Sequence, residues 1–458
     1  MTDLPRLTAL KILHKASQKG ARLEPVLESH LAKEKMEDRD RAFVSELVYG
    51  VVRWRRGLDE IIQGASGRPV KAIDPYVLDI LRLGLVQMTV LTKVPVSAAV
   101  NESVNLARSA SSTRPSTGFV NGVLRGIIRK FGLNKKRRTV MEMAESIVPK
   151  KAPPRERLAV KYSFPDWMVK RWAAKYGEKG AETILAGSQK QAPVFFRLNV
   201  REHAAGEIEK KFAEWGIAAE KFEYVENAYR LTKGKITPRS PFFMQGHVQP
   251  QDGASMIAAS LLEPAENGLS ADICCGKGIK TGFFASRIRD GKIVAMDNSF
   301  LKLSHLKTNM RRQGIANVKA VATDAASPWP VKARFGAIYI DAPCSGSGLF
   351  RRHPEGKWNK GLELVHEMAK LQLAMLGRAA VELAAGGVMV YSVCSIEPEE
   401  GEEQVERFLS GDRRFKRDNI KSKRPDLAEF ITQKGDILIL PGQKGMDGFF
   451  AARLVRAK

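Results

Sequence analysis

The apolar residues of roughly the first 130 positions recur at intervals of three and four, which is the spacing of one face of an α-helix. Four such stripes stand out, and no convincing alternating run, typical of a strand, interrupts them. Asp74 and Pro75 precede the third stripe, as an N-cap residue and a first-turn proline would. We expect residues 1–133 to form an all-α bundle. The stripes are Ala9, Ile12, Leu13 and Ala16; Phe43, Leu47, Val51 and Trp54; Val77, Ile80, Leu81, Leu85 and Met88; and Val120, Val123, Leu124, Ile127 and Phe131.

From residue 247 to the end of the chain, short apolar runs alternate with helical stripes. This alternation predicts a doubly wound, Rossmann-like α/β domain with a parallel sheet. Polar residues follow the carboxyl ends of four runs, and open α/β sheets bind their ligands at these ends. The expected strands are 269–274, 293–296, 318–322, 337–340 and 388–391, and the polar residues are Asp297, Asp324, Asp341 and Cys394.

Two further stretches lie between these parts. Residues 134–160 contain four consecutive basic residues at 135–138 and several prolines, which predicts a linker whose charges either contact phosphates or are solvated. Residues 161–246 mix helical and strand patterns, which predicts a small α+β subdomain. Phe195 and Phe196 lie in its short strand, and we expect both in the core rather than stacked on RNA bases.

Charge identifies the class of partner. The 458 residues carry a formal net charge of +25, and such a field attracts a phosphate polymer, so RNA or DNA is the expected partner and a merely soluble, basic surface is the alternative. No stretch approaches the length of a membrane span and the start lacks the apolar core of a signal peptide, so we expect a cytoplasmic monomer without membrane contact. The four cysteines and seven histidines show no zinc-site spacing, so we expect reduced thiols and no metal.

Two cysteines follow neighbouring predicted strands. The first lies in DAPCSGSG, residues 341–348, and the second in YSVCSIEPEE, residues 391–400. Parallel strands deliver both thiols to one edge of the sheet, which suggests covalent chemistry. A buried, inert thiol is the commoner fate of a cysteine; we expect it for Cys274 and Cys275, and we do not expect it for Cys344 and Cys394.

The two motifs together resemble the Sun-type RNA cytosine-5 methyltransferases, and residues 440–450 resemble the last hairpin of that family. The resemblance implies that the small α+β subdomain at residues 161–246 is comparable to an RNA-recognition motif. The resemblance implies that Cys394 is the nucleophile that adds to carbon 6 of cytosine. It also implies that Cys344 helps to release the product and that Asp341 holds the base. A nucleophilic thiolate needs a polar or positive setting, to which Lys280 could contribute.

The loop after the first predicted strand has two glycines, Gly276 and Gly278, before an apparent helix. Glycines let a ligand approach the backbone, and a helix start offers free N–H groups. Asp297 follows 19 positions after Gly278, close to the spacing at which an acid binds ribose hydroxyls. The sequence therefore predicts a nucleotide-like cofactor.

The family resemblance identifies the cofactor as S-adenosylmethionine. It implies that residues 274–280 surround the methionine part, that Asp297 binds the ribose and that Asp324 lies near the adenine, with Asp341 also at the cofactor. Lys277 and Ile279 depart from the proline and glycine usual in the family. The implied cofactor residues are Cys274, Cys275, Gly276, Lys277, Gly278, Ile279, Lys280, Asp297, Asp324 and Asp341.

Two groups of charged residues lie near the thiol motifs. Arg351 and Arg352 fit a phosphate clamp for RNA, and the alternative is an internal salt bridge to Glu355. The acidic cluster at residues 399–403 fits a helix start, where carboxylates interact with the helix dipole.

Residues 40–50 and 119–125 resemble NusB, whose helical RNA-binding bundle precedes the catalytic part in bacterial small-subunit (16S) ribosomal RNA methyltransferases of the B type. This resemblance covers about residues 1 to 133 and favours ribosomal RNA as substrate. A transfer RNA cytosine-5 methyltransferase is the alternative within enzymes, and a non-catalytic RNA-binding assembly factor is the alternative outside them.

Overall fold

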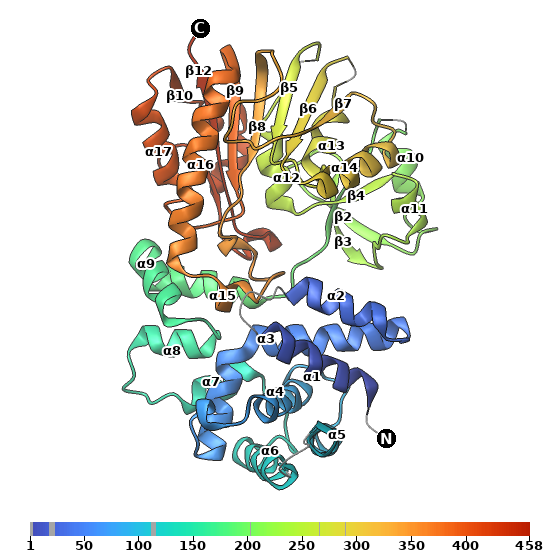
Figure 1. Ribbon diagram of the computed structural model, residues 1–458, viewed down its shortest axis with the longest axis vertical. Helices are drawn as coiled ribbons and strands as arrows, with labels where there is room; N and C mark the ends of the chain where they lie inside the picture. The colour runs from blue at the N-terminus through green and yellow to red at the C-terminus, as the bar shows by residue number, and fades with distance from the viewer. Residues whose placement is uncertain (1–2, 18–22, 111–115, 202, 265, 289) are drawn as a thin grey trace. The chain divides into compact units, whose positions relative to one another are not determined.

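The computed structural model describes residues 3–17, 23–110, 116–201, 203–264, 266–288 and 290–458. The chain divides into two compact units, Met1–Gln189 and Lys190–Lys458. In Figure 1 the first unit runs from blue to green and the second from green to red.

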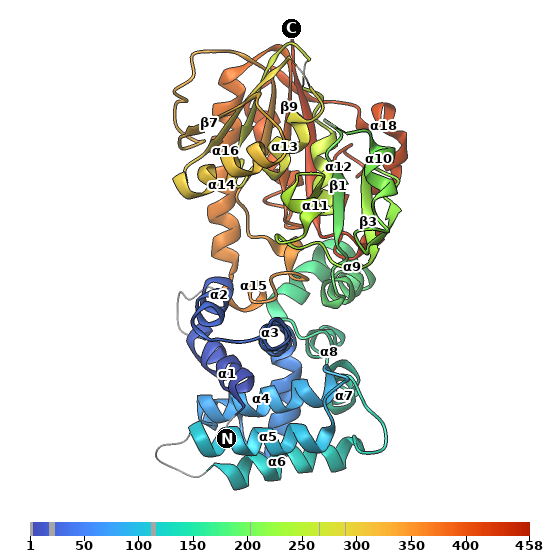
Figure 2. The ribbon, with the colours of Figure 1, turned by 90° about the vertical axis from the view of Figure 1, so that its right-hand side faces the viewer.

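The first unit is built of helices (Figure 2). All four predicted stripes lie on helices, and Asp74 caps α4 by accepting hydrogen bonds from the backbone N–H groups of Tyr76 and Val77. Most residues of the stripes are buried in a single core cluster. The helices are α1 (Leu4–Ala16), α2 (Leu23–Lys33), α3 (Asp38–Ser66), α4 (Pro75–Thr89), α5 (Val96–Ala110), α6 (Thr117–Phe131), α7 (Val140–Ile147), α8 (Pro154–Lys161) and α9 (Asp166–Gln189).

Residues 134–160 are not the linker that their charge and prolines predict. They contain α7 and most of α8, and α7 begins with a capping box in which Thr139 and Glu142 exchange hydrogen bonds. Val140 and Met143 of α7 are buried in the core of the first unit. The prediction is wrong because two short apolar stripes outweigh the flanking charges. The first unit also extends through α9, so the predicted subdomain boundary at 161 falls inside it.

A small sheet opens the second unit. Its strand order is β2-β3-β1-β4, with the paired strands antiparallel. Phe195 and Phe196 are buried on β1, and the Phe196 ring stacks on Tyr229 with centroids 5.5 Å apart, so their predicted place in the core is confirmed. The elements are β1 (Phe195–Leu198), α10 (Ala205–Lys210), β2 (Ala218–Lys221), β3 (Ala228–Lys233), α11 (Pro241–Met244) and β4 (Val248–Pro250).

The large sheet of the second unit has the strand order β10-β12-β9-β8-β5-β6-β7, with β11 paired to β12. Strands β5 to β9 pair in parallel at the predicted positions. The strands are β5 (Leu269–Ile273), β6 (Lys292–Asp297), β7 (Val318–Ala322), β8 (Phe335–Asp341), β9 (Leu383–Val393), β10 (Phe415–Arg417), β11 (Ile437–Ile439) and β12 (Phe449–Arg456).

Helices cover both faces of this sheet (Figure 1). One face packs against α12, α13 and α14 and the other against α16 and α17. Chain order reverses between β5 and β8, so their carboxyl ends flank the switch point, where doubly wound sheets bind ligands. The helices are α12 (Gly253–Ser260), α13 (Ile279–Ala285), α14 (Phe300–Arg312), α15 (Gly356–Asn359), α16 (Leu362–Glu382), α17 (Glu402–Gly411) and α18 (Ile420–Lys423).

Candidate active site

The two candidate thiols meet at the carboxyl edge of the large sheet. β8 and β9 pair in parallel with Asp341 opposite Ser392, so each cysteine lies a short step beyond its strand. The Sγ atoms of Cys344 and Cys394 are 3.1 Å apart, close enough to share a proton. The hydrogen bond to Cys394, together with burial, raises the pKa of Cys344 well above its usual value. Cys344 can therefore stay protonated beside a second sulfur, that of Cys394, which is available to react.

Asp341 lies at the end of β8 with about a third of its side chain exposed. Its Oδ2 accepts a hydrogen bond from Lys280 Nζ at 2.6 Å, and its Oδ1 lies 3.4 Å from the Ser392 hydroxyl. Lys280 also lies over the Phe449 ring, 5.5 Å from the centroid. The lysine is thus paired with the carboxylate and the Phe449 ring rather than with either thiol.

The loop between β5 and α13 has an unusual backbone. Cys274, Gly276 and Gly278 all have positive φ angles, of 61°, 57° and 78°. A Cβ atom at Gly278 would lie 2.8 Å from Leu306, so a larger residue would clash there, whereas one at Gly276 would meet open space. The loop therefore presents its backbone to an open region at the start of α13, as a bound nucleotide-like group requires.

Two thiols, Cys274 and Cys275, lie in the same loop. Burial raises the pKa of both Cys274 and Cys275, which keeps these thiols protonated and unreactive. Cys275 is buried, as predicted, while Cys274 is partly exposed. Lys277 and Ile279 contribute backbone contacts, since their carbonyl groups accept hydrogen bonds from Asn309 and Arg197. The departures from the family pattern therefore leave the loop anchored by main-chain bonds.

Asp297 joins this loop to α14. Its Oδ2 accepts the N–H of Gly276 at 3.0 Å and its Oδ1 accepts the N–H of Ser299 at 2.9 Å. Each carboxylate oxygen has a second lone pair for a ribose hydroxyl. Asp324 follows β7 and is exposed, and its carboxylate caps a turn by accepting from Ala326 and Ser327. Both acids lie at the sheet edge that carries the thiols.

Arg351 does not fit the predicted RNA clamp. Its side chain is buried, and Nη1 donates to the carbonyl groups of Gly445 and Met446 at 2.8 Å each. Nη2 donates to the carbonyl of Gln191 at 2.9 Å. A guanidinium that is buried and bonded to several carbonyl groups holds loops together and cannot reach a phosphate.

Arg352 is also committed within the protein. Its Nε donates to Asp447 at 2.5 Å and its Nη2 to Asp252 at 3.0 Å, so its salt bridges are internal but do not involve Glu355. Burial and the neighbouring Asp447 raise the pKa of Asp252 to about 6. Arg351 therefore does not fit the clamp, whereas the Arg352 side chain is about one-third exposed and its contact with RNA stays a prediction.

Glu400 is the residue that the sequence interpretation missed. It was assigned to a helix start, but α17 begins at Glu402 and the Glu400 side chain is completely buried. Its carboxylate contacts Ser345 and Ser395, the residues that directly follow the two cysteines. The signal available was its place in the PEE triplet at residues 398–400, which begins four positions after Cys394.

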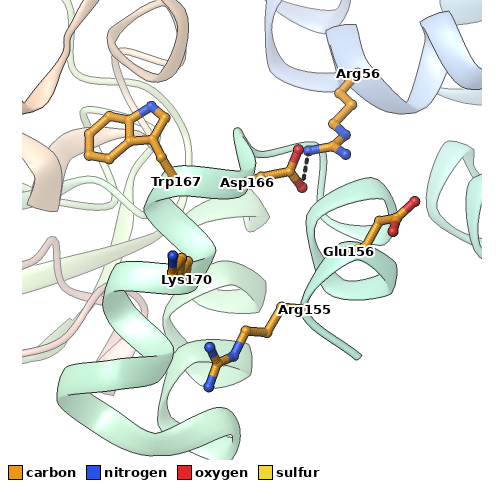
Figure 3. Close-up of a pocket in the computed structure, with 6 residues that line it drawn as sticks. All are labelled: Arg56, Arg155, Glu156, Asp166, Trp167 and Lys170. Atoms are coloured by element: carbon orange, nitrogen blue, oxygen red, sulfur yellow. Dashed lines mark ion pairs between the residues drawn. The ribbon is translucent and has the colours of Figure 1, made fainter. Parts of the chain in front are cut away.

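A separate hollow of about 350 Å³ lies in the first unit (Figure 3). Arg56 pairs with Asp166 at 2.9 Å there, and Arg155 lies 3.9 Å from Glu178. These pairs largely balance the local charge, so the hollow does not by itself indicate an anion site. The lining residues are Arg56, Arg155, Glu156, Asp166, Trp167 and Lys170.

Among the described residues, no three or more histidine, cysteine, aspartate or glutamate side chains are grouped to hold a metal ion. Nor does any helix in that part of the chain have the length and apolarity to cross a membrane.

Three protein families match the chain. Residues 259–455 match the 16S rRNA methyltransferase RsmB/F family, residues 3–129 match the NusB family, and residues 164–237 match the ferredoxin-like domain of RsmF/B-like methyltransferases. The fold expected from the sequence, a NusB-like bundle followed by an α+β subdomain and a methyltransferase sheet, is thereby confirmed.

Relatives align over nearly the whole chain. A probable ribosomal RNA small subunit methyltransferase B of Bacillus subtilis is 32% identical, with 96% of each chain covered. Ribosomal RNA small subunit methyltransferase B of Vibrio cholerae is 29% identical, with 98% of this chain and 96% of that protein covered. The crystal structure of NSun6 from Pyrococcus horikoshii with SFG has a TM-score of 0.58 at 20% identity, over 65% of this chain and 99% of the other, and supports the fold.

Proposed function

This chain belongs to the RsmB/F family of 16S rRNA methyltransferases, which are RNA cytosine-5 methyltransferases, and from that premise we propose that it methylates carbon 5 of one cytosine in small-subunit ribosomal RNA. The observation that carries the proposal is the 3.1 Å separation of the Cys344 and Cys394 sulfurs at the switch point of the sheet. The net charge of +25 fits an RNA substrate.

The family uses S-adenosylmethionine, and the loop of residues 274–280 is suited to hold it. The open space at Gly276 leaves room for a ligand beside the backbone, and Asp297 has lone pairs left for ribose hydroxyls. Asp324 is the acid proposed to lie near the adenine. Bound at this loop, S-adenosylmethionine supplies an electrophilic methyl group.

Cys394 is the proposed nucleophile. Its sulfur loses a proton to solvent and donates an electron pair to carbon 6 of the cytosine, forming a C–S bond. The pair displaced from the C5–C6 double bond makes carbon 5 nucleophilic, and the ring nitrogen takes up a proton from solvent. Carbon 5 would then bond to the methyl group as the bond between that methyl and the cofactor sulfur breaks, with S-adenosylhomocysteine as the leaving product. Asp341 holds the base edge and stabilises the protonated ring nitrogen, while Lys280, at 2.6 Å, fixes the orientation of the carboxylate.

Release of the product reverses the attack. Carbon 5 loses its proton to water, the electron pair restores the double bond, the bond from carbon 6 to the Cys394 sulfur breaks, and the ring nitrogen returns its proton to solvent. Cys344 retains its own proton and hydrogen-bonds the departing thiolate 3.1 Å away, which stabilises the leaving group. In this scheme each thiol acts once, first Cys394 as nucleophile and then Cys344 as donor.

Bisulfite sequencing of RNA from cells with and without the gene tests the proposed substrate. We expect one cytosine of 16S ribosomal RNA to be protected from conversion only when the gene is present. If removal of the gene abolishes protection of a cytosine in transfer RNA but of none in 16S ribosomal RNA, the substrate is transfer RNA. No change in either RNA would support an assembly factor without catalysis.

A further inference from the structure

A buried polar cluster lies directly behind the two thiols. Its centre is the Glu400 carboxylate, which is 0% exposed, and its other members are the side chains of Ser345, Ser347, Ser395 and Gln372, at most 4% exposed. Neither a bound base nor the cofactor loop needs these groups in the scheme above. The cluster therefore calls for a role of its own.

The carboxylate connects the loop of one cysteine to the loop of the other. Its Oε1 accepts the backbone N–H of Ser345 at 2.6 Å, and its Oε2 accepts the Ser345 hydroxyl at 2.5 Å. The same Oε2 accepts the Ser395 hydroxyl at 2.5 Å. Ser345 follows Cys344 and Ser395 follows Cys394, so one carboxylate fixes the residue next to each sulfur.

Further bonds make the cluster rigid. Ser347 lies 3.0 Å from Ser395, and the two hydroxyls accept the backbone N–H groups of Ile396 and Glu397. Gln372 of α16 donates to the Pro343 carbonyl at 2.8 Å and lies 3.4 Å from Glu400 Oε1. The loops therefore have little freedom to move apart.

The polar partners of Glu400 favour its ionised form. Two serine hydroxyls and one backbone N–H lie within hydrogen-bond distance of its oxygens, and hydrogen bonds to a carboxylate stabilise the charged form. Burial raises the pKa of Glu400, and the hydrogen bonds from Ser345 and Ser395 oppose that shift. The other charged groups at the cluster are Glu397, which adds to the raising effect, and Lys360, which donates to the Ser345 carbonyl.

We propose that Glu400 is a positioning residue that holds the two cysteine loops at their working separation and, as a buried anion bonded twice to Ser345 beside Cys344 and once to Ser395 beside Cys394, keeps the proton on Cys344 so that Cys394 is the sulfur that attacks. This inference rests on the proposed function for the meaning of the attack. The negative charge acts more strongly on a thiol inside the protein than it would in water, because the interior screens charge weakly.

Thiol alkylation without RNA tests this assignment. Wild-type enzyme, Glu400→Gln and the control Glu403→Gln are treated with iodoacetamide between pH 6.5 and 9, and each cysteine is followed by mass spectrometry. Glu403 is exposed at the start of α17, so the control removes a carboxylate without touching the cluster. We expect Glu400→Gln to raise the rate at Cys344 about tenfold relative to Cys394, the ratio that one pKa unit produces, and the control to leave it unchanged.

Methylation assays give the second readout. In Glu400→Gln, kcat should fall at least tenfold. The KM for RNA and for S-adenosylmethionine should stay within about twofold, because the substitution does not touch the cofactor loop or the RNA-binding surface. Ser395→Ala removes one hydrogen bond of the cluster and should shift both readouts in the same direction, so it decides the question if Glu400→Gln does not fold.

The two proposals fail in different ways. An unchanged Cys344 to Cys394 alkylation ratio in folded Glu400→Gln or Ser395→Ala would overturn the role of Glu400, whatever the substrate. A shifted ratio in an enzyme that methylates no RNA would leave Glu400 as the residue that sets the thiol pair and would refute the proposed function alone.

Discussion

Asp272 should make the second unit less stable as the pH rises. Its side chain is completely buried on β5, where Oδ2 accepts the Thr281 hydroxyl at 2.6 Å and Oδ1 has no hydrogen-bond partner among the described residues. Burial raises the pKa of this carboxyl to about 7 from 3.8. The folded protein therefore keeps a proton on Asp272 at a pH at which the unfolded chain has already lost it.

The sign and size of the effect follow from proton linkage. Between pH 5 and pH 8 the unfolded state binds fewer protons at this residue than the folded state, so the free energy of unfolding falls with pH, by about 2.5 kcal/mol for the quoted pKa values. Asp272→Asn keeps the hydrogen bond from Thr281 but cannot titrate. Its stability relative to wild type should therefore rise by about 2.5 kcal/mol across that range and change little beyond pH 8.

Urea unfolding at pH 5, 6, 7 and 8, with folded material scored by a brief proteolysis pulse, measures this difference on the full chain. Comparison with wild type cancels the titration of Asp252 and Asp436, whose raised pKa values are unaffected by the substitution. Asp290→Asn, at an exposed position, is the control and should show no pH-dependent difference. A difference for Asp272→Asn that stays constant across the range would refute the assigned pKa and its cause.

Three other outcomes are expected. Asp297→Ala should weaken S-adenosylmethionine binding at least tenfold in calorimetry, since a hydrogen bond to a charged group contributes about 1.5–3 kcal/mol; undiminished affinity would remove the ribose assignment. Replacement of the exposed Lys135 and Lys136 by serine should flatten the slope of log RNA affinity against log salt by up to about two; an unchanged slope would mean that both are only solvated. Arg351→Met should lower the free energy of unfolding by about 3 kcal/mol in urea titrations, because it leaves buried carbonyl groups unpaired; a loss of RNA affinity without a loss of stability would restore the clamp.

The large sheet could be predicted from the sequence because its signals are local. Each strand is a short apolar run. Asp297 and Asp341 end β6 and β8 and Cys394 follows β9, so local sequence alone indicates which edge of the sheet binds ligands. Cys344 and Cys394 were placed at one edge by the same argument, and their sulfurs lie 3.1 Å apart. The order of the strands and the position of each cysteine just beyond its strand were enough to predict this part of the site.

The fate of the charged residues could not be predicted in the same way. Arg351 bonds to Met446, 95 positions away, and Glu400 bonds to Ser345, 55 positions away. A charged side chain is buried only when the fold brings such partners to it, and local sequence contains no record of them. The helix α7 is the opposite case. The basic residues before it predicted a solvated linker, but its apolar residues are buried in the core of the first unit.

The central claim, that the two thiols act in sequence, is tested most directly by trapping the enzyme on its RNA. Cys394→Ala and Cys344→Ala are each incubated with 16S ribosomal RNA and S-adenosylmethionine and run on a denaturing gel. Cys344→Ala should show a slow, nuclease-sensitive band of enzyme joined to methylated RNA, because attack proceeds and release fails. Cys394→Ala and the double variant should show no such band and no methylation. A band in Cys394→Ala in place of Cys344→Ala would reverse the roles, and methylation by both variants without any band would contradict the covalent mechanism.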